Sequence, residues 1–371
     1  MNLARTAVCT AILTAPIWTA PVRAQDASNS PLPKRLIGDY GYWSRTQVPP
    51  YAAAQIPFHK LTHINHAGVS FGAKGNLTVP AGFLEPQLIA KAHAAGVKVL
   101  LLLGGDFTGL ETDAAALPNL IGNLQSFLAK HDYDGVDIDW EYPASDLDEQ
   151  TFYALMEALR TAFPTPRYLL SADVPPWGGT GYDFPQVTPL VDYFNIMTYD
   201  CAGPWTDDGQ LNSAIFPDPT NPEPYECEPG GSVEEAIDIY VQQLNIAPGK
   251  LNIGTPFYGY FYKNVDKLFG PCTHCGRTVL SENYGTFIKQ RIDQDGWQTF
   301  YDTYAFVPYM LRTDGKPGYI TYDDNFSTYY RIWYSDWQRG LGGSFMWSLD
   351  AYYDGNSQDL LDAMYAATLN N

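Results

Sequence analysis

Positive charge is scarce in this sequence, and charged residues of either sign are few. Lys and Arg number 22 against 41 Asp and Glu in 371 residues, so the formal net charge at pH 7 is −19. A chain with so few basic residues lacks the positive face that nucleic-acid binding needs, and we expect no nucleic-acid partner. Only 17% of residues are charged and 45% are hydrophobic, which excludes disorder for most of the chain. We therefore expect a globular protein, and we expect it to be a monomer.

Long uncharged runs are also absent, apart from one near the N-terminus. Residues 6–22 carry no charge, Arg5 precedes them, and Val22-Arg23-Ala24 offers a small-residue cleavage site. This is the pattern of a secretory signal peptide over residues 1–24. A membrane anchor is disfavoured, because two prolines interrupt a stretch that is shorter than the roughly 20 apolar residues of a spanning helix. We predict a secreted protein, extracellular or periplasmic, with no membrane partner and with a disordered lead-in over residues 25–33.

Cysteine is scarce too, and the predicted cleavage leaves four cysteines, Cys201, Cys227, Cys272 and Cys275. An even number in an oxidising compartment predicts disulfides. Of the three possible connectivities we favour Cys201 with Cys227 and Cys272 with Cys275, because each pair falls within one expected loop region. Cys272-Thr-His-Cys275 also has the spacing of half a zinc site, but no second close Cys/His pair would complete four ligands. The prediction is therefore two disulfides, no metal and no cofactor.

Eight apolar, strand-like runs alternate with amphipathic stretches along the chain. The runs are 35–43, 61–71, 97–103, 135–140, 168–173, 191–199, 251–257 and 343–348. Helical spacing of apolar residues occurs between them, for example at Leu120, Leu124 and Leu128. This alternation is typical of a parallel sheet buried on both faces, and eight units predict an α/β fold, the (β/α)8 TIM barrel. We expect the barrel over residues 34–371, with a small α+β insertion at 260–324 between strands seven and eight.

The most informative segment is residues 134–143, Asp-Gly-Val-Asp-Ile-Asp-Trp-Glu-Tyr-Pro. Side chains alternate along a strand, so Asp137, Asp139 and Glu141 share one face and the apolar residues between them share the other. The apolar face has to pack on the helices, which turns the acids into the barrel lumen, with Glu141 nearest the carboxyl-terminal mouth where barrel active sites lie. A solvated charged face is the alternative, but a barrel strand has none. Crowded acids cannot all ionise, so a protonated Glu141 could serve as general acid.

This segment resembles the signature of family 18 of the glycoside hydrolases, the chitinases, in which Asp-x-x-Asp-x-Asp-x-Glu closes the fourth barrel strand. Residues 134–141 match it at every fixed position. Further matches to family motifs extend over most of the chain, at 40–43, 104–105, 197–200, 254–259, 307–309, 322–324 and Trp347.

The resemblance implies hydrolysis of chitin or chitooligosaccharides by a substrate-assisted retaining mechanism. Glu141 would protonate the glycosidic oxygen, and the carbonyl of the substrate's own 2-acetamido group would attack C1. Asp139 would orient that group and balance its charge, while Asp137 would share a proton with Asp139. Tyr199 would donate its hydroxyl to the acetamido oxygen. The substrate-binding residues implied by the motifs are Asp200, Met197, Trp347, Tyr258 and Tyr40.

Two positions depart from the family pattern. Leu102 stands where the third strand usually has a serine that helps to hold the buried Asp pair. Asp106 follows Gly104-Gly105 where an aromatic residue often lies, so one stacking platform is missing there. Trp177 and Trp205, in the expected loops after strands five and six, either replace it as substrate-binding residues or pack in the core.

Two other functions remain open at this point. An endo-β-N-acetylglucosaminidase that cuts the core of N-glycans would use the same acids. A chitin-binding lectin that kept the barrel and lost catalysis is the alternative from a different class, because a fold alone never proves activity. The intact Glu141 argues against the lectin.

Overall fold

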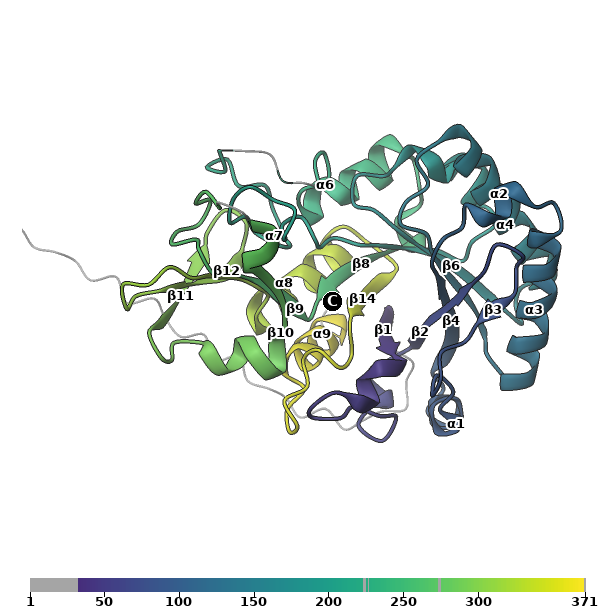
Figure 1. Ribbon diagram of the computed structural model, residues 1–371, viewed down its shortest axis with the longest axis horizontal. Coiled ribbons are helices and arrows are strands. Elements are labelled where there is room, and N and C mark those ends of the chain that lie inside the picture. The colour runs from purple at the N-terminus through teal and green to yellow at the C-terminus, as the bar shows by residue number, and fades with distance from the viewer. Residues whose placement is uncertain (1–32, 223–224, 226, 273–274, 370–371) are drawn as a thin grey trace, which may run out of the picture. The chain divides into compact units, whose positions relative to one another are not determined.

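Eight parallel strands close into a barrel in the computed structural model, which describes residues 33–222, 225, 227–272 and 275–369 (Figure 1). The predicted signal peptide and all but the last residue of the predicted lead-in lie outside these residues. The barrel strands are β1 (Arg35–Gly41), β2 (His63–Phe71), β4 (Lys98–Gly104), β5 (Gly135–Asp139), β6 (Leu169–Val174), β7 (Tyr193–Ile196), β8 (Leu251–Pro256) and β14 (Gly343–Trp347). Neighbours follow the order β1-β14-β8-β7-β6-β5-β4-β2, and parallel pairing of β1 with β2 closes the ring. The predicted (β/α)8 fold is confirmed.

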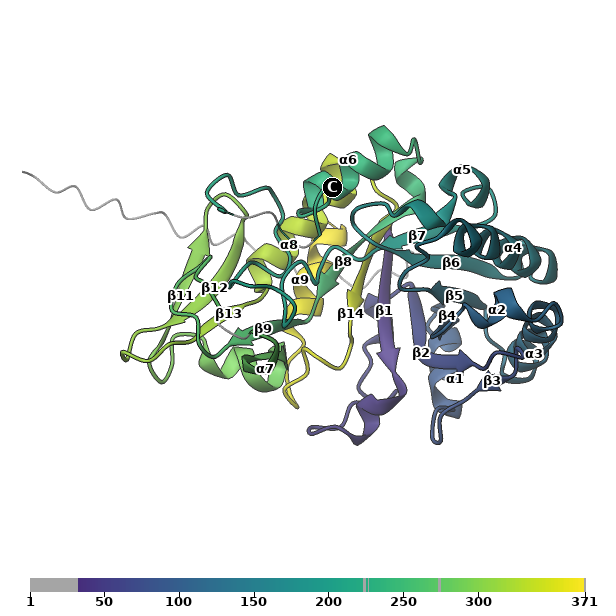
Figure 2. The ribbon, with the colours of Figure 1, turned by 45° about the horizontal axis from the view of Figure 1, so that its top comes forward.

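Helices cover the outer face of the barrel strands (Figure 2). They are α1 (Pro86–Ala94), α2 (Gly109–Thr112), α3 (Ala116–His131), α4 (Asp146–Ala162), α5 (Phe184–Val187), α6 (Val233–Asp238), α8 (Asn325–Trp333) and α9 (Asp359–Leu369). The stripe Leu120, Leu124 and Leu128 of α3 is completely buried, as its spacing predicts. Burial of such stripes against the strands leaves the lumen to the side chains that point inward.

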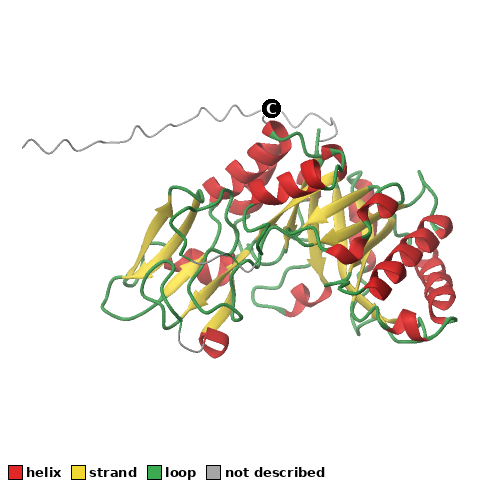
Figure 3. Cartoon of the chain, turned by 90° about the horizontal axis from the view of Figure 1, so that it is seen from above, coloured by secondary structure: helices red, strands yellow, loops and turns green. Residues whose placement is uncertain are grey.

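A second sheet lies between β8 and β14 in the chain, and Figure 3 shows its strands in yellow apart from those of the barrel. It is antiparallel, in the order β10-β9-β13-β12-β11. Its elements are β9 (Tyr258–Tyr262), α7 (Cys275–Thr278), β10 (Val279–Asn283), β11 (Trp297–Asp302), β12 (Val307–Arg312) and β13 (Tyr319–Thr321), while the short β3 (Leu77–Thr78) pairs with β2. The sheet starts two residues before the predicted insertion because β9 follows β8 after a single residue, Phe257.

Two disulfides join Cys201 with Cys227 and Cys272 with Cys275, the local pairing that the sequence favours. The first bond joins cysteines that are 26 positions apart in the segment that follows β7. The second lies at the start of α7.

Within the described residues, the helices are all too short or too polar to cross a membrane.

A buried arginine of α8 forms an ion pair beside its own helix and a hydrogen bond to the segment that follows β7. Arg331 donates through one Nη atom to Asp323 Oδ1 and to the backbone oxygen of Ser213, both at 2.8 Å. Neither side chain of the pair is more than 1% exposed. The Ser213 hydroxyl in turn donates to the backbone oxygen of Thr198 at 2.6 Å, so α8 braces the segment that follows β7.

We expect Asp323→Ala to lower the free energy of unfolding by about 3–5 kcal/mol, because it leaves a buried guanidinium without its carboxylate. Asp362→Ala is the control, since it removes the same side chain from an ion pair with Lys60 whose carboxylate is 56% exposed. For that variant the expected loss is below about 1 kcal/mol. Urea unfolding followed by circular dichroism measures both, and equal losses would contradict the role given to the buried pair.

Candidate active site

The acids of β5 lie on its lumen side. Asp137 is completely buried, and so are Val136 and Ile138, which belong to the apolar core outside the strand. Asp139 is the last residue of β5, and Glu141 follows two residues later with its side chain exposed to solvent. The alternation read from the sequence therefore places one acid deep in the barrel, one at the strand end and one at the mouth.

Asp137 is held by donors from three other strands. Its carboxylate accepts from Asn65 Nδ2 of β2 at 2.9 Å, from the Ser171 hydroxyl of β6, and from Asn195 Nδ2 of β7 at 3.4 Å. Burial raises the pKa of Asp137 to about 6, and hydrogen bonds from Ser171 and Asp173 oppose that rise. Leu102, which pairs with Asp137 in the register of β4 and β5, has no hydrogen-bond donor in its side chain, so the donors to Asp137 come from β2, β6 and β7.

Asp139 and Glu141 form the next pair outward. Burial raises the pKa of Asp139 well above its ordinary value, and the charge of Glu141 and a hydrogen bond with it raise that pKa further. Among the described residues, Asp139 Oδ1 has no hydrogen-bond partner. A hydrogen bond between two carboxyls requires a proton on one of them, which the pair can transfer to a bound group, while the open Asp139 Oδ1 can accept a hydrogen bond from that group.

A pocket of about 200 Å³ lies over these acids. Its lining residues are Asp139, Glu141, Tyr142, Asp173, Met197, Tyr199, Asp200, Tyr258 and Trp347. The pocket thus gathers seven of the residues named from the sequence, with Asp137 beneath them. A larger depression of about 480 Å³, lined by residues of α8 and α9 such as Phe326 and Asp359, contains none of these acids.

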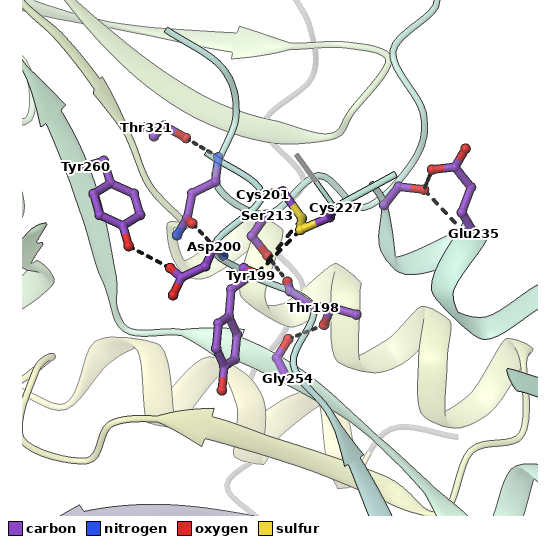
Figure 4. Close-up of a disulfide and its surroundings, with 12 residues drawn as sticks. Thr198, Tyr199, Asp200, Cys201, Ser213, Cys227, Glu235, Gly254, Tyr260 and Thr321 are labelled. Carbon is purple, nitrogen blue, oxygen red and sulfur yellow. Dashed lines mark hydrogen bonds between the residues drawn. A yellow bond between two sulfur atoms is a disulfide. The ribbon is translucent and has the colours of Figure 1, made fainter. Parts of the chain in front are cut away.

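The segment after β7 presents Tyr199 and Asp200 to the pocket (Figure 4). Asp200 has a left-handed backbone with φ of 60°, and its N–H donates to Asn212 Oδ1 at 2.9 Å. Its carboxylate accepts from the hydroxyls of Tyr258 and Tyr260, the latter at 2.7 Å. Burial raises the pKa of Asp200 and these two hydrogen bonds lower it. Burial also keeps the pKa of Tyr199 well above 10, so its phenol remains a donor.

The remaining residues named from the sequence lie elsewhere. Tyr40 is completely buried in the core, and its hydroxyl donates to Glu85 at 2.7 Å. Trp177 packs edge-on against Tyr142, with ring centroids 5.1 Å apart. Trp205 is 51% exposed and meets Tyr260 edge-on at 5.8 Å. In the described part of the chain, the lining of the pocket includes none of Tyr40, Trp177 and Trp205.

Sequence reasoning missed two lumen acids, Asp39 of β1 and Asp173 of β6. Burial raises the pKa of both well above the ordinary value, and the charge of Asp137 raises them further. The signal that could have found Asp173 is its spacing of two from Ser171, which puts both on the lumen face of the predicted strand. Tyr142, the residue after Glu141, was not among the site residues named from the sequence, yet it lines the pocket.

The raised pKa of Asp39 predicts a pH-dependent gain for Asp39→Asn. In the unfolded chain this carboxyl ionises near 3.8, so the folded protein loses stability as the pH rises past that value and through the raised pKa. The amide cannot ionise and carries no such penalty. Urea unfolding should give Asp39→Asn the higher unfolding free energy at pH 8, with a difference that shrinks toward pH 4. A difference that does not change with pH would show that charge is not its cause.

Comparison with known proteins decides the family. The model of the Glycosyl hydrolases family 18 matches residues 35–351. The chain belongs to this family. Among relatives in sequence, the endochitinase of Manduca sexta is 25% identical over 361 residues, which cover 85% of this chain and 63% of that protein. Chitinase B of Serratia marcescens is 25% identical over 413 residues, which cover 90% of this chain and 81% of that protein.

Solved structures show the same fold. The Group IV chitinase of Ostrinia furnacalis superposes with a TM-score of 0.78 at 22% identity, covering 91% of this chain and 100% of that one. Its complex with allosamidin superposes with a TM-score of 0.77. The chain spans less than two thirds of the Manduca protein.

Proposed function

We propose that this protein is a secreted chitinase that hydrolyses β-1,4-linked N-acetylglucosamine polymers by a substrate-assisted retaining mechanism. The observation that carries the proposal is the hydrogen-bonded pair of Asp139 and Glu141 in a pocket that also presents Tyr199 and Trp347. Family membership and the chitinase names of the relatives support the same activity. We further propose that it works as a monomer and needs no cofactor.

In this proposal Glu141, at the mouth of the pocket, donates its proton to the glycosidic oxygen as the bond from that oxygen to C1 breaks. The carbonyl oxygen of the 2-acetamido group on the same sugar attacks C1 and forms an oxazolinium. Asp139 accepts a hydrogen bond from the acetamido N–H, and its negative charge balances the positive charge of the oxazolinium. Water then loses a proton to Glu141 and attacks C1 from the opposite face, so two inversions leave the β configuration.

The pocket walls support this assignment. The protonated Tyr199 hydroxyl is available to donate to the acetamido oxygen. Asp200, fixed by Tyr258 and Tyr260, offers an acceptor to a sugar hydroxyl. Trp347 is the last residue of β14 and lines the pocket. Its ring offers an apolar surface on which the C–H face of a pyranose can stack.

Ligands of solved relatives point to the same substrate class. The Ostrinia furnacalis Group IV chitinase was solved with allosamidin, and a Class V chitinase from Nicotiana tobaccum was solved with NAG4. Trp177, which packs against the pocket residue Tyr142, and Trp205, which packs against Tyr260, would contact sugars further along the substrate.

The test compares soluble chitooligosaccharides with N-glycoproteins, digested side by side by the full protein. We expect shorter N-acetylglucosamine oligomers from the first and intact glycans on the second. Release of N-glycans without cleavage of chitooligosaccharides would assign an endo-β-N-acetylglucosaminidase instead. Binding of chitooligosaccharides without cleavage would assign a lectin.

Export is tested separately, by expressing the full chain in a secreting host. We expect the exported protein to begin at Gln25, as N-terminal sequencing would show. Retention of residues 1–24 on a membrane-bound product would contradict the proposed signal peptide.

A further inference from the structure

Asp173 stands in the catalytic pocket without a role in the mechanism above. It pairs in register with Asp139 of β5 on one side and with Asn195 of β7 on the other. Its side chain lines the pocket, although the residue is only 5% exposed. A buried carboxyl at this place has to be neutralised or paired.

The amide of Asn195 joins Asp173 to Asp137. Its Nδ2 donates to Asp173 Oδ1 at 3.0 Å and to Asp137 Oδ1 at 3.4 Å. Its Oδ1 accepts from Asn252 Nδ2 at 2.8 Å, and Asn252 Oδ1 accepts from Arg35 Nε at 2.8 Å. Because the oxygen of Asn195 is engaged by this chain, the nitrogen has to face the two carboxyls. Both acids are therefore held within hydrogen-bond distance of one nitrogen.

The titratable groups around Asp173 are carboxyls and one phenol, with no cation among those of the described residues. The titratable neighbours are Asp39 from β1, Asp137 and Asp139 from β5, Glu141 from the loop after β5 and Tyr199 from the segment after β7. Neighbouring carboxylates at such separations do not all ionise. The donors of Asn65 and Ser171 converge on Asp137, whereas in the described part of the chain Asp173 accepts from Asn195 alone. This imbalance leaves the negative charge on Asp137 and a proton on Asp173.

We propose that Asp173 is a positioning residue that shares its proton with Asp137 across β5 and β6, which leaves Asp139 free to face Glu141 and the substrate. The Asp173 hydroxyl donates to a carboxylate oxygen of Asp137, and the pair holds one proton and one negative charge throughout the reaction. No covalent bond changes. This inference rests on the proposed function, since it assigns a task within the same site.

The two substitutions Asp173→Asn and Asp173→Ala separate the proton from the packing. Asn retains an N–H donor for Asp137, and Ala removes it. For Ala, we expect kcat on a soluble chitooligosaccharide to fall at least tenfold and the acidic limb of the pH profile to move up by about one pH unit, because Asp137 then takes up a proton more readily. Asn should restore the wild-type acidic limb and most of kcat. It should also lack any alkaline step that comes from ionisation of Asp173.

The matched control is Asp336→Asn. Asp336 is completely buried, its pKa is raised by burial to about 7, and it bonds Ser344 near the start of β14, next to Lys34 and Arg35. Its loss should leave the acidic limb unmoved. A wild-type acidic limb in Asp173→Ala, or an Asn variant as impaired as Ala, would overturn the proposal.

A titration without substrate keeps this inference distinct from the proposed function. With ¹³C-labelled aspartate, the Asp137 carboxyl resonance, identified by its loss in Asp137→Asn, should titrate in two steps in the wild type and in one step in Asp173→Asn. Identical titration curves would overturn the shared proton even if the enzyme is active. Two steps in a protein that cleaves no chitooligosaccharide would support the pair and reject the proposed function alone. This measurement also decides the matter if the Ala variant does not fold.

Discussion

Glu141→Gln should lower kcat for chitooligosaccharides by at least about 10²–10⁴-fold, the range assigned to general acid catalysis. The amide has the same shape and remains at the mouth of the pocket, but it has no proton to transfer. Glu141 is exposed and belongs to no ion pair among the described residues, so the substitution should leave the fold unchanged. Initial rates on a soluble oligomer, with thermal unfolding of both proteins, measure the effect.

The matched control is Glu157→Gln, the same change on the exposed face of α4, which should retain the wild-type rate. Binding separates catalysis from recognition. Titration calorimetry should give Glu141→Gln a dissociation constant for the oligomer close to that of the wild type, because Tyr199, Asp200 and Trp347 still line the pocket. Near-normal hydrolysis by folded Glu141→Gln would refute the assignment of the general acid.

The fold could be predicted because its signals are local and repeated. Each predicted strand coincides with an observed one to within a few residues, since an apolar run in a buried parallel strand needs no information about its neighbours. The placement of Asp137 and Asp139 followed from the same reasoning, because the alternation of side chains settles which residues of one strand point inward.

The parts that could not be predicted depend on which strands are neighbours. Asp39, Asp137 and Asp173 come from three strands, and only closure of the barrel brings their carboxyls together. The donors that hold Asp137 likewise come from β2, β6 and β7, which no motif links. Tyr40 is a different case, since its place in a family motif suggested a substrate contact, which stays a prediction. The structure instead buries its ring and bonds its hydroxyl to Glu85.

The group that attacks C1 of the sugar can be identified from the first product and from the choice of substrate. If the acetamido carbonyl attacks C1, proton NMR early in the hydrolysis of a chitin oligomer should show the β-anomer first. Fully deacetylated chitosan oligomers lack the internal nucleophile and should not be cleaved. The β-anomer is expected because water can reach C1 only from the face that the acetamido group leaves open.

Asp139→Asn should be strongly impaired although Glu141 is untouched, with kcat falling about 10²–10³-fold, the usual loss when one group that stabilises developing charge is removed. The oxazolinium is positive, and Asp139 is the acid in hydrogen-bond contact with Glu141 at the strand end, where that charge would form. The pH profile of the variant should lose the step that belongs to the shared proton.

Initial α-anomer, or efficient cleavage of fully deacetylated oligomers, would mean that water or a protein carboxylate attacks C1 directly. Asp139 would then have no oxazolinium to balance.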